Sequence, residues 1–166
     1  MILNVQKLKK SYAQGERKLE IINDLNLSLE KGKTLAILGQ SGSGKSTLLS
    51  LLSGLDQPDE GAIILDGSDL GKLSESELTD LRARKIGIVF QNFHLLPHLS
   101  ALENVALSLE ILKIERPFEI AKKWLSRVGL SAREDHFPDQ LSGREKQRVA
   151  IARALAISPD LILADE

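Results

Sequence analysis

Short apolar runs in the first third of the chain predict strands. Residues 25–29 alternate apolar and polar side chains with a period of two, as a half-buried strand does. After a turn at residues 31–33, residues 35–38 are all apolar, which predicts a buried parallel strand. Residues 62–65 and 86–90 are further strand candidates. The chain therefore begins with a mainly β region.

Helical spacing begins at Lys45, and leucines recur on one face up to Gly54, which stands where a helix C-cap glycine belongs. A strand, a glycine-rich loop and a helix thus follow one another. A second helix is expected over residues 74–84, because Ser74 and Glu77 form a capping box at its start.

From residue 100 the pattern becomes helical. Ser100 and Glu103 form another capping box ahead of an amphipathic segment, and Pro117 can open a further helix that ends before Gly129. These segments predict a helical lobe over about residues 93–141.

The last part of the chain predicts one more helix and one more strand. Ser142 and Glu145 make a third capping box, and the helix that it opens should run to about Ala156. The apolar run at residues 161–164 then predicts a strand. With the strands of the first third, this order indicates an α/β fold.

Composition limits the functions to consider. The 166 residues, 42% of them hydrophobic, suit one globular domain. Lys and Arg number 22 against 23 Asp and Glu, so no net field attracts nucleic acid. No cysteine is present, no apolar run approaches a membrane span, and the N-terminus lacks the order of a signal peptide. A cytoplasmic location fits best, and any membrane role is expected to be through a partner.

The loop between the predicted strand and helix reads Gly39-Gln40-Ser41-Gly42-Ser43-Gly44-Lys45-Ser46, the Walker A spacing. Its glycines let successive amides converge on phosphate oxygens at a helix N-terminus. Lys45 would reach the β and γ phosphates, and the Ser46 hydroxyl would ligate Mg²⁺. A glycine-rich turn before a helix is the structural alternative. The full match to the motif predicts that the loop binds a nucleoside triphosphate, and ATP is the expected one.

Asp165 and Glu166 follow the last predicted strand, at the sheet edge where a phosphate-bound metal would lie. Asp165 would hold Mg²⁺, and Glu166 would act as general base toward the attacking water. Two acids after an apolar run also occur by chance. The upstream Walker A motif favours the Walker B interpretation.

These motifs, together with residues 141–155 (Leu-Ser-Gly-Arg-Glu-Lys-Gln-Arg-Val-Ala-Ile-Ala-Arg-Ala-Leu) and 89–91 (Val-Phe-Gln), resemble the ATP-binding-cassette (ABC) ATPases along nearly the whole chain. Residues 39–55, 89–93, 96–97 and 102–105 look like the subfamily of lipoprotein-release, macrolide-export and cell-division ATPases.

The resemblance implies a P-loop core of the RecA type, with a mostly parallel sheet, an N-terminal antiparallel portion and an inserted helical lobe. It implies an ATPase with Mg²⁺ whose two copies close on ATP as a homodimer and drive a transmembrane permease from the inner face of the membrane. No nucleic-acid partner is expected.

The resemblance also assigns roles to single residues. Tyr12 would stack on adenine, although a tyrosine near a strand end is ordinary. Gln91 would sense metal and attacking water, and Ser142 with Gly143 would reach the γ phosphate of the other copy, besides the N-cap role of Ser142. The expected sets are, for nucleotide, Tyr12, Gly39, Gln40, Ser41, Gly42, Ser43, Gly44, Lys45, Ser46, Thr47, Ser142 and Gly143; for metal, Ser46, Gln91 and Asp165; for catalysis, Lys45, Gln91 and Glu166.

Two departures from the family pattern affect these expectations. Arg144 replaces the second glycine of the signature, which predicts altered dimer closure. The sequence ends after the Walker B acid, before a further core strand and a switch histidine of the family, so a truncated cassette with lower stability and slow turnover is expected. The alternatives are a non-catalytic ATP-binding fragment and a soluble ABC-type ATPase outside transport. A small GTPase is disfavoured, because no Asn-Lys-x-Asp motif occurs.

Overall fold

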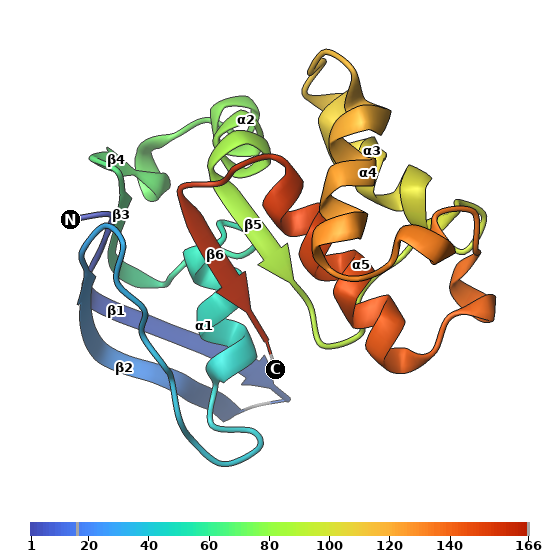
Figure 1. Ribbon diagram of the computed structural model, residues 1–166. Coiled ribbons are helices and arrows are strands. Elements are labelled where there is room, and N and C mark those ends of the chain that lie inside the picture. The colour runs from blue at the N-terminus through green and yellow to red at the C-terminus, as the bar shows by residue number, and fades with distance from the viewer. Residues whose placement is uncertain (16, 166) are drawn as a thin grey trace. The chain divides into compact units, whose positions relative to one another are not determined.

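The computed structural model describes residues 1–15 and 17–165, which form two compact units, Met1–Asp80 and Leu81–Glu166 (Figure 1). Glu166, the predicted catalytic base, lies outside the described residues. A single domain with an inserted lobe at about 93–141 stays a prediction.

The first unit is built on an antiparallel sheet with strand order β2-β1-β3-β4. Strand β1 pairs with both neighbours, so that Leu3 lies opposite Leu29 on one side and Leu65 on the other. The strands are β1 (Leu3–Gln14), β2 (Arg17–Leu29), β3 (Glu60–Leu65) and β4 (Ser68–Asp69).

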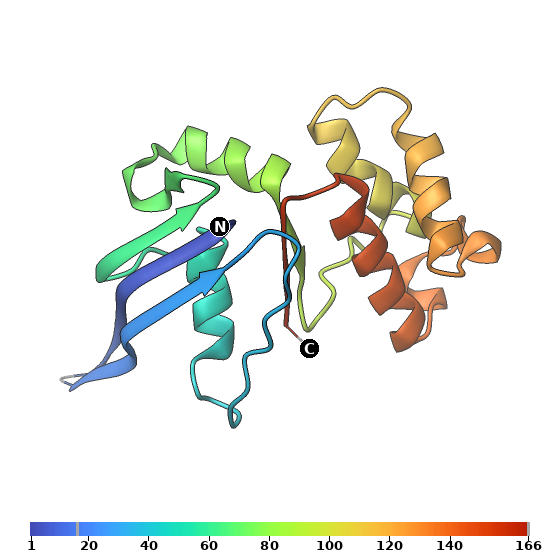
Figure 2. The same ribbon diagram turned by 60° about the vertical axis from the view of Figure 1, so that its left-hand side comes forward.

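Helix α1 (Lys45–Leu52) lies beside this sheet in both views (Figures 1 and 2). It buries Leu48, Leu51 and Leu52, and it ends before Gly54, whose left-handed φ of 67° confirms the predicted C-cap glycine. After the 3₁₀ turn η1 (Leu70–Lys72), helix α2 (Glu75–Lys85) leads from the first unit into the second.

The second unit combines a parallel strand pair with three helices (Figures 1 and 2). Strands β5 (Ile86–Val89) and β6 (Leu161–Ala164) pair in register from Ile86 with Leu161 to Val89 with Ala164. The helices and turns are α3 (Ala101–Ile111), α4 (Pro117–Arg127), η2 (Ser131–Arg133), η3 (Pro138–Gln140) and α5 (Gly143–Ala156).

The three helices share one apolar core, because each presents a stripe of buried side chains to the other two. Val105 and Leu109 of α3, Leu125 of α4 and Val149 of α5 are fully buried in it. The local signals predicted these helices: Pro117 is at the start of α4, and both Ser100 and Ser142 make complete capping boxes.

The predicted strand at residues 35–38 is wrong in this structure. These residues form no strand, and Leu35, Ile37 and Leu38 are 45%, 37% and 91% exposed. An apolar run becomes a strand only when a neighbouring strand satisfies its backbone groups. Within the described residues, no strand pairs with this run. The apolar pattern indicates a segment suited to burial. Whether it forms a buried strand depends on a neighbouring strand that can pair with it.

We expect Leu109→Ala to destabilise the helical unit by about 2–5 kcal/mol, because it leaves a cavity in a fully buried core. Ile111→Ala, two residues along the same helix at a side chain 65% exposed, is the control and should change stability by less than about 0.5 kcal/mol. Urea unfolding followed by the fluorescence of Trp124, the chain's single tryptophan, measures both. Equal effects of the two substitutions would contradict this packing.

Candidate nucleotide-binding site

The glycine-rich loop leads into helix α1 through a left-handed backbone. Gly42 and Gly44 have φ angles of 80° and 89°, and Gly44 is the residue that caps α1. A Cβ at Gly44 would lie 2.7 Å from Cγ2 of Ile21, so a side chain there would force Ile21 to move. Together with the left-handed φ, this makes glycine the residue that turns the chain into the helix at Lys45 without strain. The result is a curled loop whose amides precede a helix N-terminus.

Lys45 places its charge across this loop. Its Nζ donates to the carbonyl oxygens of Gly39 at 2.8 Å and of Gln40 at 2.9 Å. The first turn of α1 has no acidic residue. A lysine ammonium and the positive end of a helix thus coincide, a combination suited to phosphate oxygens. The Ser46 hydroxyl is exposed in the same turn, where it can join a metal ion held by those phosphates.

Tyr12 lies beside the start of the same helix. Its hydroxyl donates to Oδ2 of Asp56 at 2.7 Å, a bond that raises the pKa of the phenol, and the nearby Thr47 side chain opposes this shift. Two of the predicted nucleotide contacts, Tyr12 and Thr47, are therefore brought together. The partners Lys10 and Asp56 were not predicted. A weak signal existed for Lys10, since residues two apart on a strand share a face.

The second unit gathers Gln91 and Asp165. Both come just after the paired residues Val89 and Ala164, at the carboxyl edge of the parallel strands. The amide N–H of Asp165 donates to the carbonyl of Val89 at 2.9 Å, which ties the two strand ends together. This edge is where ligands bind in parallel α/β sheets, so the location fits the predicted metal contacts.

The start of α5 is closed by a reciprocal cap. The backbone N–H and the hydroxyl of Ser142 donate to Oε2 of Glu145 at 2.8 and 2.7 Å, and Nε of Arg133 donates to Oε1 at 3.0 Å. Gly143 and Arg144 are exposed beside it. The structural role of Ser142 as an N-cap is thus confirmed. To reach a phosphate, its hydroxyl would have to leave Glu145.

Arg153 is a positioning residue that the sequence did not reveal. It projects from α5, and its guanidinium donates to the carbonyl oxygens of Phe93 and His94, each at 2.7 Å. Both of those residues have a left-handed backbone, with φ of 58° and 46°. A non-glycine residue rarely adopts this conformation unless it is held there. Arg153 therefore fixes the segment that follows Gln91.

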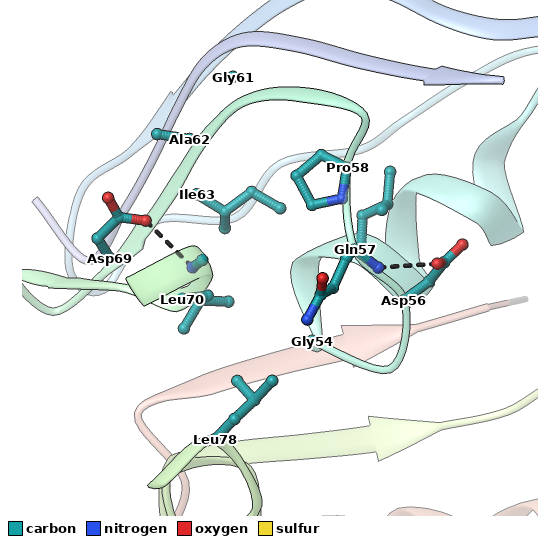
Figure 3. Close-up of a pocket in the computed structure, with 12 residues that line it drawn as sticks. Gly54, Asp56, Gln57, Pro58, Gly61, Ala62, Ile63, Asp69, Leu70 and Leu78 are labelled. Atoms are coloured by element: carbon teal, nitrogen blue, oxygen red, sulfur yellow. Dashed lines mark hydrogen bonds between the residues drawn. The ribbon is translucent and has the colours of Figure 1, made fainter. Parts of the chain in front are cut away.

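A small cavity lies at the other end of α1 (Figure 3). Its volume of about 30 Å³ is far below the 300–1,000 Å³ or so of a ligand pocket. Its polar groups are engaged, since Asp69 accepts from the N–H of Gly71 and Asp56 from that of Gln57. Much of the remaining lining is apolar, from Leu51, Pro58, Ile63, Leu70 and Leu78. The cavity is a packing gap with no room for a nucleotide.

The predicted site residues thus form three groups, one in the first unit and two in the second, each described within its own unit. Among the described residues, no group of three or more His, Cys, Asp or Glu side chains could hold a metal ion by itself. None of the helices in the described part of the chain is long and apolar enough to cross a bilayer.

Residues 22–166 match the family described as ABC transporter. The lipoprotein-releasing system ATP-binding protein LolD of Bordetella pertussis is 48% identical over 99% of this chain and 72% of its own length. The LolD of Geobacter metallireducens is 45% identical over 99% of this chain and 74% of its own length.

Solved structures agree. A dimeric post-hydrolysis state of the ATP-binding cassette MJ0796, bound to ADP and Pi, superposes with a TM-score of 0.94 at 41% identity, covering 99% of this chain and 74% of that one. A second dimeric structure of MJ0796, a bacterial ABC transporter cassette, gives 0.94 at 42% identity, with the same coverage. The predicted α/β cassette fold, with its antiparallel N-terminal sheet, is confirmed.

The cap of α5 should persist to low pH. Bonds from the Ser142 backbone and hydroxyl, and then from Arg133, lower the pKa of Glu145 from 4.5 to about 2. Because the folded pKa is the lower one, the cap's contribution to stability is complete above pH 4.5 and is lost as pH falls toward 2. Carboxyl ¹³C NMR should show a midpoint near 2, shifted upward by Ser142→Ala. A midpoint near 4.5 in the unaltered chain would contradict the capping geometry.

Proposed function

This chain belongs to the ABC transporter family, and on that premise we propose that it binds ATP with Mg²⁺ and hydrolyses it to drive a lipoprotein-release or export permease. The observation that carries the proposal is the curled loop at Gly42 and Gly44, with the Lys45 ammonium drawn across it at a helix N-terminus. The Lys45 ammonium and the N-terminus of α1 meet there, and the first turn of the helix has no acidic residue to repel a triphosphate.

In the proposed site, each loop residue has a defined task. The backbone N–H groups of residues 39–47 surround the phosphates, and Lys45 exchanges its two carbonyl acceptors for phosphate oxygens, a stronger charge-assisted interaction. The Ser46 hydroxyl would hold Mg²⁺, which would neutralise charge on the phosphates, and Asp165 and Gln91 in the second unit are the further metal ligands that the family resemblance predicts.

Hydrolysis in this proposal depends on the acid after β6. Glu166 accepts a proton from water as that water attacks the γ phosphorus, and the bond from phosphorus to the bridging oxygen of ADP breaks. Gln91 helps to orient this water. Arg153 keeps the segment after Gln91 in place, because it binds the carbonyls of Phe93 and His94.

A second copy of the chain completes the proposed site. Ser142 and Gly143, at the N-terminus of α5, would face the γ phosphate bound to the other copy. The cassette MJ0796 is dimeric with ADP and Pi bound, which supports this arrangement. Arg144 stands exposed at the same end, so its side chain is expected to alter how closely two copies approach.

The proposed partner is a transmembrane permease. The relatives named LolD are ATP-binding proteins of a lipoprotein-releasing system, and this chain is 48% identical to one of them. We place it at the cytoplasmic face of the membrane through that partner, which would select the transported substrate.

Lys45→Ala should weaken Mg-ATP binding at least about tenfold, because it removes the one charged donor of the loop.

Glu166→Gln should leave the affinity for Mg-ATP within about twofold and lower turnover by about 100-fold or more, since the base is lost. Lys123→Ala, an exposed lysine of α4, is the charge-matched control and should change neither. Calorimetric titration and phosphate release measure binding and turnover separately.

Equal affinity for Mg-ATP in Lys45→Ala and the unaltered chain would contradict the loop's role. ATP binding without any phosphate release in the unaltered chain would instead support a non-catalytic nucleotide-binding protein.

A further inference from the structure

An ion pair between the buried Lys10 and the partly exposed Asp56 lies beside Tyr12. Lys10 is only 8% exposed, and its Nζ donates to Oδ1 of Asp56 at 2.8 Å and to the carbonyl of Gln57 at 2.7 Å. The other oxygen of the same carboxylate accepts the Tyr12 hydroxyl at 2.7 Å. Asp56 therefore joins the buried lysine to the phenol through its two oxygens.

Lys10 also acts on the ring itself. Its Nζ lies over the Tyr12 ring, 5.0 Å from the centroid, within the range of a cation–π interaction. The ring is thus fixed at its hydroxyl by Asp56 and on one face by Lys10. A planar ligand can stack only on the face that Lys10 leaves open. With 42% of the residue exposed, such a ligand can reach it from solvent.

The pair remains charged at neutral pH. Burial raises the pKa of Asp56, but hydrogen bonds from Lys10, Tyr12 and the Gln57 amide outweigh it, so the net shift is downward. Burial likewise lowers the pKa of Lys10, and the bond to Asp56 reverses this, so that its pKa is raised. Removing Asp56 would leave the buried Lys10 ammonium without its carboxylate partner, so Lys10 favours the position in which Asp56 holds it.

The held ring lies next to the phosphate-binding loop. Thr47, close enough to influence the phenol, is two residues after Lys45 in the first turn of α1. A nucleotide whose phosphates occupy the loop would therefore have its base within reach of this ring.

We propose that the Lys10–Asp56 ion pair is a positioning device that holds the Tyr12 ring as a stacking platform for the purine base of the bound nucleotide. This inference rests on the proposed nucleotide binding at the loop. Aromatic stacking on a base is worth about tenfold or more in affinity, and it requires the ring to be in place before the ligand arrives. The pair thus contributes to recognition of the base and leaves the phosphates to the loop.

A purely structural role is the competing explanation, since the pair also joins β1 to the segment at residues 56–57. The two roles differ in which part of the ligand they affect. A positioning device affects affinity only for ligands that carry a base, whereas a structural tie also affects the phosphate loop.

The test compares Mg-ATP with Mg-bound inorganic triphosphate in calorimetric titrations of the whole chain. Asp56→Asn removes the charge, and Tyr12→Phe removes only the hydroxyl while keeping the ring. Both should weaken ATP about three- to tenfold and leave triphosphate affinity within about twofold. Asp59→Asn is the matched control, because Asp59 accepts from the adjacent Ser11 and does not bond to Tyr12. It should change neither affinity.

Tyr12→Phe keeps the test decisive if Asp56→Asn does not fold, which circular dichroism would reveal. Equal loss of ATP and triphosphate affinity would show that the pair is only a structural tie and overturn the inference. Unchanged ATP affinity in Tyr12→Phe would overturn it too. If the unaltered chain bound neither ligand, the proposed function itself would fail, a result distinct from both.

Discussion

The absence of a side chain at Gly44 is the constraint on which the nucleotide-binding half of this protein depends. With Cγ2 of Ile21 only 2.7 Å from where a Cβ would lie and φ at 89°, any other residue would strain the backbone and displace Ile21 where the chain turns into helix α1. That turn places Lys45 across the loop and Ser46 and Thr47 on the first helical turn. Thr47 on that turn also lies near the Tyr12 hydroxyl, whose pKa it lowers in opposition to Asp56.

Two carboxylates also position side chains of the proposed site. Each stays ionised because it accepts hydrogen bonds from the donors that it connects. Asp56 links Lys10 to Tyr12 in the first unit, and Glu145 links Arg133 to Ser142 in the second. In both cases the hydrogen bonds lower the pKa of the acid below its usual value. Polar ties of this kind orient the side chains that we propose to contact nucleotide, while the apolar core fixes the helices behind them.

The helix starts and the phosphate-binding loop were predictable from the sequence, because their signals lie within a few consecutive residues. Each capping box and Pro117 marked a helix start, and the spacing from Gly39 to Ser46 identified the loop. The strand expected at residues 35–38 failed because its stability depends on a partner strand that local pattern does not report. Local pattern also could not predict the roles of Lys10, Asp56 and Arg153. Their hydrogen-bond partners lie 44 to 60 residues away in the sequence.

Binding of the phosphates through the backbone of the loop is tested most directly by amide NMR during Mg-ATP titration. Saturable shifts of the amide signals of residues 42–47 are expected, with shifts of Asp56 and Gln57 as the base meets the Tyr12 ring. Gly44→Val should abolish the loop shifts while the signals of helices α3 to α5 keep their positions, because that substitution meets Ile21 in the first unit only. Loop amides that stay unchanged at saturating Mg-ATP would contradict it.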